Sequence, residues 1–327
     1  MSAVDRVRCA PTAWLAALLV IAVAAALAVG PGRIGLPGGA DAARLILLEI
    51  RLPRALLGVF VGGALGLSGA VLQGYLRNPL AEPALLGISG GAALGAVVAI
   101  HSGAAAMLSL ALPLGGLAGA GIAAGLLLVL AGRDAGPLTL ILAGVAVASL
   151  SGALTALALS LSPNPFASVE IMLWLMGSLD DRSLAHVWLA APLVLAGGAL
   201  LVSTGRALDA LTLGEDAAAN LGVDLRHLKL RVVAGTALAV GAATAVAGSI
   251  GFVGLVVPHL LRQLVGHAPR RLLVPSALAG AALVTLADAG LRLFAPYGGV
   301  RLGVVTALVG APFFLWLLLK SRRELGP

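Results

Sequence analysis

The residues that could carry covalent chemistry are two serines, each set in the spacing Gly-x-Ser-Gly, at 66–69 and at 87–90. The second, Ser89, could act as a nucleophile if a base such as His259 on another helix lay within hydrogen-bond reach. The chain holds 44 glycines, so the pattern forms easily, and it occurs twice. An intramembrane serine protease is therefore the weakest alternative, and we expect no catalytic residue. His259 follows Pro258 and is predicted to be a structural residue at a helix end.

Ionisable residues inside apolar stretches would mark an ion-driven carrier, and few are present. Asp288 is the best candidate, but Arg292 follows it by one helical turn, which predicts an i,i+4 ion pair near a helix end. Glu170, Asp180 and Asp181 belong to a segment that we expect outside the membrane. An ion-coupled secondary transporter is kept as an alternative with little support.

The sequence contains no motif for nucleotide hydrolysis. No Gly-x-x-x-x-Gly-Lys-Ser/Thr phosphate loop occurs, and the GPGRIG of residues 30–35 contains Pro31 and follows an apolar run. Cys9 is the single cysteine, which excludes an internal disulfide and a multi-cysteine metal site. We expect no metal site and no cofactor on this chain, so ATP and Mg²⁺ would belong to a separate ATPase.

The composition requires a lipid environment. Of the 327 residues 60% are hydrophobic and 11% charged, with a mean hydropathy of +1.07. A soluble domain normally carries about 25% charged residues. The net charge of +7 arises mostly between apolar runs, where it is better explained by membrane orientation than by nucleic acid.

The charged residues divide the chain into apolar intervals, and a membrane span needs roughly 20 apolar residues. The intervals are 9–32, 55–76, 83–132, 135–169, 183–205, 232–261, 272–287 and 302–319. The interval 83–132 is long enough for two helices, and 232–261 divides at the GSIG of residues 248–251. The sequence therefore predicts an all-α polytopic membrane protein of about ten helices, forming one transmembrane domain over residues 1–327.

An even number of spans places both termini on one side. If that side is the cytoplasm, most arginines and lysines lie there, as the positive-inside rule requires. The run 9–32 is longer than the apolar core of a signal peptide, so we expect an uncleaved first helix. Glycines at spacing four, as in Gly58, Gly62 and Gly66, predict close helix packing.

The longest polar insertion covers residues 203–231, on the predicted cytoplasmic face between the sixth and seventh spans. Its GEDAAANLGVDLRHL stretch begins with acidic residues, which favour a helix N-terminus. This helix either lies on lipid headgroups or docks a cytosolic partner.

Seven stretches in a fixed order resemble the FecCD-type permeases, the membrane subunits of binding-protein-dependent importers for siderophores, haem and cobalamin. They are RLPR (51–54), GGALGLSGAVLQGYLRNPLAEPALLGISGGAALGA (62–96), LILAGVAV (140–147), GEDAAANLGV (214–223), GSIGFVGLVVPHLLR (248–262), LADAGLRL (286–293) and GVVTALVGAPFFLWLL (303–318).

The resemblance implies the type II ABC importer permease fold, with cargo passing between two copies of the chain. It implies two cytosolic ATPase subunits, a periplasmic binding protein and a multi-pass location in the bacterial inner membrane. The expected cargo is a metal chelate, haem or a ferric siderophore first and cobalamin next.

The resemblance also assigns roles to residues by position. The coupling residues, which face the ATPase from the 203–231 segment, would be Gly214, Glu215, Leu221 and Gly222. The residues closing the cytoplasmic end of the pathway would be Asn78, Leu80 and Thr139. The residues that dock the binding protein would be Arg51, Arg54 and Arg292.

Two features of the sequence bear on these roles. Where the family usually has Glu-Leu-Pro-Val/Ile-Gly, this chain has YGGVRLGVV at 297–305, which adds Arg301 on the predicted outer face. In the stretch 77–96, Asn78–Pro79 is predicted to end the second span. Glu82–Pro83 is predicted to begin the third, because an acid and a proline suit a first turn.

Overall fold

The structure is a computed structural model that describes residues 3–35, 39–133, 136–162, 165–294 and 299–324. The elements are α1 (Ala3–Ala28), β1 (Val29–Gly30), β2 (Arg33–Ile34), α2 (Ala40–Leu45), the π-helix η1 (Ile46–Arg51), α3 (Leu52–Tyr75), the 3₁₀-helix η2 (Pro83–Leu86), α4 (Ile88–His101), α5 (Ala104–Met107), α6 (Ala111–Ala131), α7 (Pro137–Ser160), α8 (Pro165–Leu175), α9 (Leu184–Ser203), α10 (Gly205–Leu211), α11 (Glu215–Asn220), α12 (Leu225–Ala247), α13 (Val253–Val265), α14 (Pro269–Phe294) and α15 (Leu302–Glu324).

The prediction of about ten helices that span a membrane is confirmed. Seven helices of the described residues are long and apolar enough by themselves. Shorter apolar helices add Ile88–His101, Val253–Val265 and Leu302–Leu317, beside the 11-residue α8. The interval 83–132 divides into α4 and α6, and 232–261 divides at Gly248, as expected.

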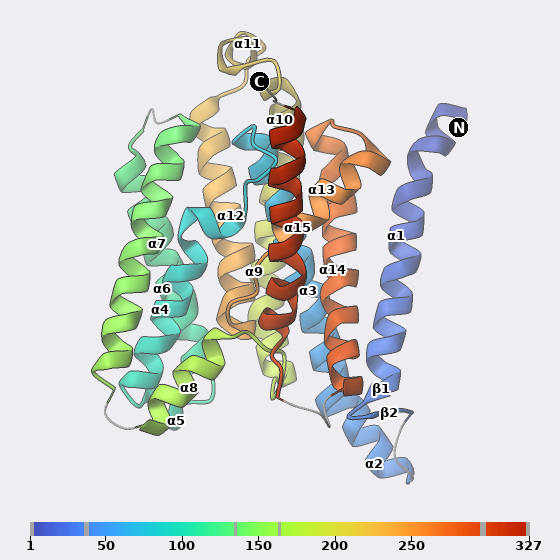
Figure 1. Cartoon of the computed structure of the whole chain (residues 1–327), viewed down its shortest axis with the longest axis vertical. Coiled ribbons are helices and arrows are strands. Elements are labelled where there is room, and N and C mark those ends of the chain that lie inside the picture. The colour runs from blue at the N-terminus through green and yellow to red at the C-terminus, as the bar shows by residue number, and fades with distance from the viewer. Residues whose placement is uncertain (1–2, 36–38, 134–135, 163–164, 295–298, 325–327) are drawn as a thin grey trace.

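The helices run roughly parallel between two ends of the molecule (Figure 1). One end carries α10 and α11, together with the start of α1 and the end of α15; we call it the α11 end. The opposite end carries α2 and the hairpin of β1 and β2, in which Val29 pairs with Ile34; we call it the hairpin end. The first and last helices therefore have their chain ends on one side, as an even number of spans requires.

The centre of the bundle is packed through glycine. A Cβ atom on Gly62 of α3 would collide with the backbone of Gly280 of α14, and one on Gly66 with the backbone of Ser276. Lipid supplies no hydrophobic drive for helix association, so backbones that approach this closely gain van der Waals contact instead. The small-residue spacing in the sequence correctly predicted this contact.

The prediction for His259 was wrong in one respect. The residue lies in the interior of α13, not at a helix end, and α13 continues to Val265. Its ring packs edge-on against Phe313 of α15, with 5.7 Å between the ring centroids. The role of His259 shown by this contact is a structural one, joining α13 to α15.

Candidate functional site

The chain between α3 and α4 makes a compact turn at the α11 end. The side-chain oxygen of Asn78 accepts a hydrogen bond from the Leu80 amide at 2.9 Å, and its carbonyl accepts one from the Ala81 amide at 3.1 Å. Asparagine closes turns in this way because its side chain imitates a backbone carbonyl. Asn78 and Leu80 are both half-buried here, so the turn holds them against the bundle.

Glu82 does not begin the third span, contrary to the sequence prediction. Residues Pro83–Leu86 form a 3₁₀ turn, Gly87 adopts a left-handed φ of 73°, and α4 begins at Ile88. The Glu82 carboxylate instead accepts a hydrogen bond at 2.7 Å from the amide of Phe252, the residue before α13. Burial raises the pKa of Glu82, and this hydrogen bond opposes the rise. The acidic residue therefore stabilises the start of a distant helix.

Thr139, the third predicted gate residue, belongs to α7 and not to the turn. It is exposed in the first turn of α7, which begins at Pro137. The same helix does contact the turn further along, because Gly144 packs against the backbone of Leu85 and Leu86. The connection between α7 and the turn thus runs through Gly144, and the role of Thr139 stays a prediction.

The part of the predicted coupling segment that contains its four named residues folds around the short helix α11. Gly214, with φ of 105°, precedes α11, and Gly222, with φ of 84°, follows it. The amides of Gly222 and Val223 donate to the carbonyls of Ala219 and Ala218, the hydrogen bonds that end a helix at a left-handed glycine. The side chain of Leu221 is 65% exposed, so this end of α11 presents an apolar residue to solvent.

A second cap, within the same segment, begins α12. The Asp224 carboxylate accepts a hydrogen bond from the His227 amide at 2.9 Å and lies 2.6 Å from the His227 ring nitrogen. Both contacts lower the pKa of Asp224, and the hydrogen bond from the His227 amide has the larger effect. The segment between α10 and α12 therefore has a defined shape at both of its ends.

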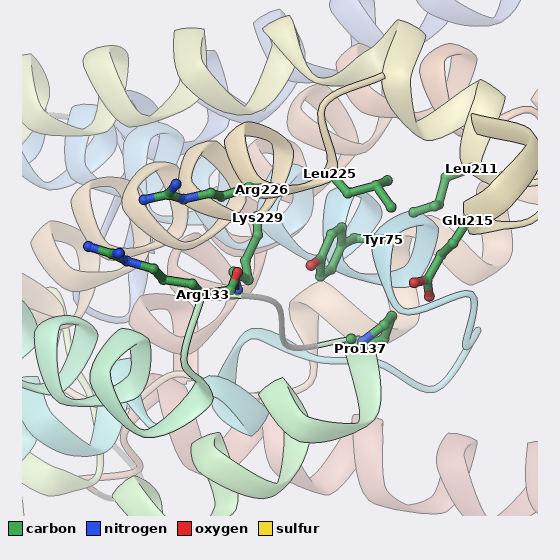
Figure 2. A pocket seen from close by; sticks show the side chains of 9 residues that line it. Tyr75, Arg133, Pro137, Leu211, Glu215, Leu225, Arg226 and Lys229 are labelled. Carbon is green, nitrogen blue, oxygen red and sulfur yellow. Dashed lines mark hydrogen bonds between the residues drawn. The ribbon is translucent and has the colours of Figure 1, made fainter. Parts of the chain in front are cut away.

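Glu215 of α11 joins the coupling segment to the turn. Its carboxylate lies 3.4 Å from the Arg77 guanidinium, and both side chains are substantially exposed. Beside Glu215 lies a cavity of about 210 Å³, whose lining also includes Tyr75 at the end of α3 and Lys229 of α12 (Figure 2). Lys229 donates to the carbonyls of Gly132 and Arg133, both at 2.7 Å, and so ties the end of α6 to α12.

The three predicted docking arginines meet at the hairpin end. Arg54 of α3 donates three hydrogen bonds of 2.8–2.9 Å to the Asp288 carboxylate, from its Nε and Nη2 atoms. Arg292 lies 3.3 Å from the same carboxylate, which confirms the predicted ion pair one helical turn apart. Arg51 donates to the carbonyls of Leu27, Ala28 and Gly35, and Arg292 to that of Val29.

Arg51 and Arg292 are buried, which the sequence did not predict. Only 3% of Arg51 and 6% of Arg292 are exposed, and their guanidinium groups hold the end of α1 and the hairpin onto η1 and α14. A direct ion pair with another protein would require either side chain to leave these bonds. Docking by the three arginines stays a prediction, and Arg54 is the one with a partner near the surface.

That partner is Asp180, which sequence reasoning had placed outside without assigning it a role. Its carboxylate forms ion pairs with Arg54 and, at 3.1 Å, with Arg301. Burial would raise the pKa of Asp180, but the charges of Arg54 and Arg301 and a hydrogen bond from Ser178 lower it overall. The sequence signal for this ion pair was only that Arg301 and the acidic residues Asp180 and Asp181 were predicted on the same face of the membrane.

This combination defines a class of protein: a multi-pass helical permease with a structured, exposed segment at one end and a charged network at the other. The chain belongs to the FecCD transport family, whose sequence profile matches residues 15–320. It is therefore a transport subunit of the ABC importer permease type and not itself an enzyme.

Relatives of known name agree with the family. The chain is 42% identical to the cobalamin import system permease protein BtuC of Halobacterium salinarum over 290 residues, 88% of this chain and 76% of that protein. It is 40% identical to the hemin transport system permease protein HmuU of Yersinia pestis over 288 residues, 87% of this chain and 86% of that protein. A solved structure described as an inward-facing conformation of a metal-chelate type ABC transporter matches with a TM-score of 0.86 and 32% identity, covering 94% of this chain and 98% of that one.

Proposed function

We propose that the chain is the membrane subunit of an ATP-driven, binding-protein-dependent importer for a metal chelate of the haem, ferric-siderophore or cobalamin type. The observation that carries the proposal is the ion pair between Arg77 and Glu215, which joins the exposed segment around α11 to the turn that holds Asn78 and Leu80. The names of the relatives, which are permeases for cobalamin and hemin, support the class of cargo.

The proposed assembly contains two copies of this chain, two cytosolic ATPase subunits and a periplasmic binding protein. The α11 end would face the cytoplasm, with both termini on that side of a bacterial inner membrane. The exposed Leu221, between the glycines that bound α11, suits a contact with an ATPase. The hairpin end would then face the binding protein.

In the proposed mechanism, ATP binding and hydrolysis in the partner move the segment 203–231. Because Glu215 contacts Arg77, movement of α11 reaches the adjacent turn without passing through the lipid-facing helices. Asn78, Leu80 and Thr139 would close the cytoplasmic end of the pathway. Gly144 packs against the same turn, so α7 would move with it.

An ion-driven mechanism has less support. The strongest candidate for a proton carrier was Asp288, whose carboxylate accepts three hydrogen bonds from Arg54 and lies beside Arg292. Its oxygens are already bound by arginines of α3 and α14, which is the geometry of a structural ion pair that joins two helices.

The experiment reconstitutes the chain with a cognate ATPase in liposomes and measures uptake of labelled haem, a ferric siderophore and cobalamin. Uptake of one of them should require ATP inside the compartment that faces the α11 end and binding protein on the other side. Uptake driven by a proton gradient without the ATPase would overturn the proposal. The matched variants are Glu215→Gln, which removes the contact with Arg77, and Asp216→Asn, which changes the same charge beside it.

A further inference from the structure

A cavity of about 520 Å³ opens at the hairpin end between α3, α14, residues 178–180 and the start of α15. Its lining contains the arginines Arg51, Arg54, Arg292 and Arg301 and the aspartates Asp180 and Asp288. Four guanidinium groups face two carboxylates, an excess of two positive charges. A cavity with this balance attracts acidic groups from the solution.

The two aspartates are held very differently. Asp288 is buried, with 3% of its side chain exposed, and Arg54 grips it with three hydrogen bonds. Asp180 has 39% of its side chain exposed, and its two oxygens are bound by different arginines, Arg54 and Arg301. Among the described residues, Asp180 is the carboxylate that pairs with Arg301. Asp180 is therefore the more easily displaced of the two.

The backbone around Asp180 is fixed by bonds that do not involve its carboxylate. The Ser178 amide donates to the Ala247 carbonyl at 2.7 Å, and the Gly303 amide donates to the Gly177 carbonyl at 3.2 Å. Arg182 donates to the Val246 carbonyl at 2.6 Å. The Asp180 side chain can therefore turn away from both arginines, with loss of the hydrogen bond that the Ser178 hydroxyl donates to it at 2.8 Å, while the segment 177–182 stays in place on α12 and α15.

We propose that Arg54 and Arg301 form a carboxylate-binding site that Asp180 occupies in the absence of a partner, and that an acidic side chain of a soluble protein docking at the hairpin end displaces Asp180 from it. This inference rests on the proposed function for the identity of the partner. It adds Arg301 to the surface that recognises the partner, and it makes Asp180 an internal competitor.

The exchange replaces one carboxylate with another on the same two guanidinium groups. Both states keep the arginines paired, and Asp180 gains full hydration when it leaves, so little pairing energy separates them. Such a site should favour orientation and encounter of an acidic surface more than raw affinity. Removal of the Asp180 carboxylate should therefore strengthen docking, and it should do so more than removal of the neighbouring Asp181 carboxylate, which carries the same charge but does not compete for the site.

The test uses the full chain in lipid nanodiscs without ATPase, and a synthetic hexaglutamate peptide as the probe. Asp180→Asn should raise the affinity for the peptide about threefold to fivefold, the upper part of the range of a partly exposed ion pair, and Arg301→Gln should lower it by a similar factor. Asp181→Asn is the matched control, because it removes the same charge one residue away, from a side chain that is exposed. Its effect should stay within about twofold.

Equal affinities of Asp180→Asn and Asp181→Asn would overturn the proposal, because the gain would then reflect net charge alone. If free acetate saturates the site at the same concentration of carboxylate groups as the peptide, the choice of a protein as the partner is overturned. Arg301→Lys retains the charge and should recover part of the binding if Arg301→Gln fails to fold. The peptide assay contains neither ATPase nor cargo, so its result does not depend on transport. If the peptide binds as expected but the complete system shows no transport, the proposed function is refuted and the carboxylate-binding site is not.

Discussion

Removal of the Asp288 carboxylate should destabilise the hairpin end more than any other single loss of charge in the network. In Asp288→Ala, Arg54 loses three hydrogen bonds of 2.8–2.9 Å, and Arg292, 6% exposed, loses its carboxylate. Loss of one partner from a buried ion pair destabilises a protein by about 3–5 kcal/mol. Arg54 keeps Asp180, so we expect about 3 kcal/mol, at the lower end of that range.

The assay is reversible unfolding in mixed micelles, with the free energy of unfolding compared between variants. Asp216→Ala, at an exposed position in the first turn of α11, serves as the control and should lose less than about 1 kcal/mol. The double variant Arg54→Met/Asp288→Leu should recover part of the loss, because it also removes the Arg54 donors that Asp288→Ala leaves without the Asp288 carboxylate. If Asp288→Ala unfolds no more easily than Asp216→Ala, the network does not stabilise this end.

Three further outcomes follow from the packing and the caps. Gly66→Val should prevent stable assembly of α3 on α14, because its Cβ would collide with the Ser276 carbonyl; a loss of well-folded protein by size-exclusion chromatography checks this. Arg77→Glu should lower transport-coupled ATPase activity several-fold, and the charge swap Arg77→Glu/Glu215→Arg should restore part of it. Burial raises the pKa of Glu82 above its unfolded value near 4.5. The stability that protonated Glu82 contributes is therefore full below the unfolded pKa and is lost as the pH rises through the folded pKa. Glu82→Gln keeps the acceptor for the Phe252 amide and should remove this pH dependence from the measured free energy of unfolding.

The helices could be predicted from the sequence because their determinants are local. Charged residues interrupt apolar runs where the chain leaves the membrane, and the spacing of Gly62 and Gly66 marks a face that packs closely. The Asp288–Arg292 pair was predictable for the same reason, since residues four apart share a helix face.

The rest of the site depends on contacts between residues far apart in the chain. Arg54 and Asp288 are 234 positions apart, and Glu82 is 170 positions from Phe252. Glu82 and Pro83 carry the local signals of a helix start, yet the carboxylate serves α13. The helix start moves to Ile88, after the left-handed Gly87. Local helix rules cannot tell which of two helices an acidic residue caps.

The two ends of the molecule differ in how firmly they hold α3. Helix α3 has 24 residues, about 36 Å at the rise of an α-helix, with Arg54 in its first turn and Arg77 just beyond its other end. Arg54 is mostly buried and grips Asp288 through three hydrogen bonds, whereas Arg77 meets Glu215 at 3.4 Å with both side chains in solvent. An exposed pair of this kind contributes at most about 1 kcal/mol. The ion pair at this end therefore holds α3 less firmly than the network at the hairpin end does. The turn beside Arg77, which holds Asn78 and Leu80, should therefore move more easily than the hairpin end of α3.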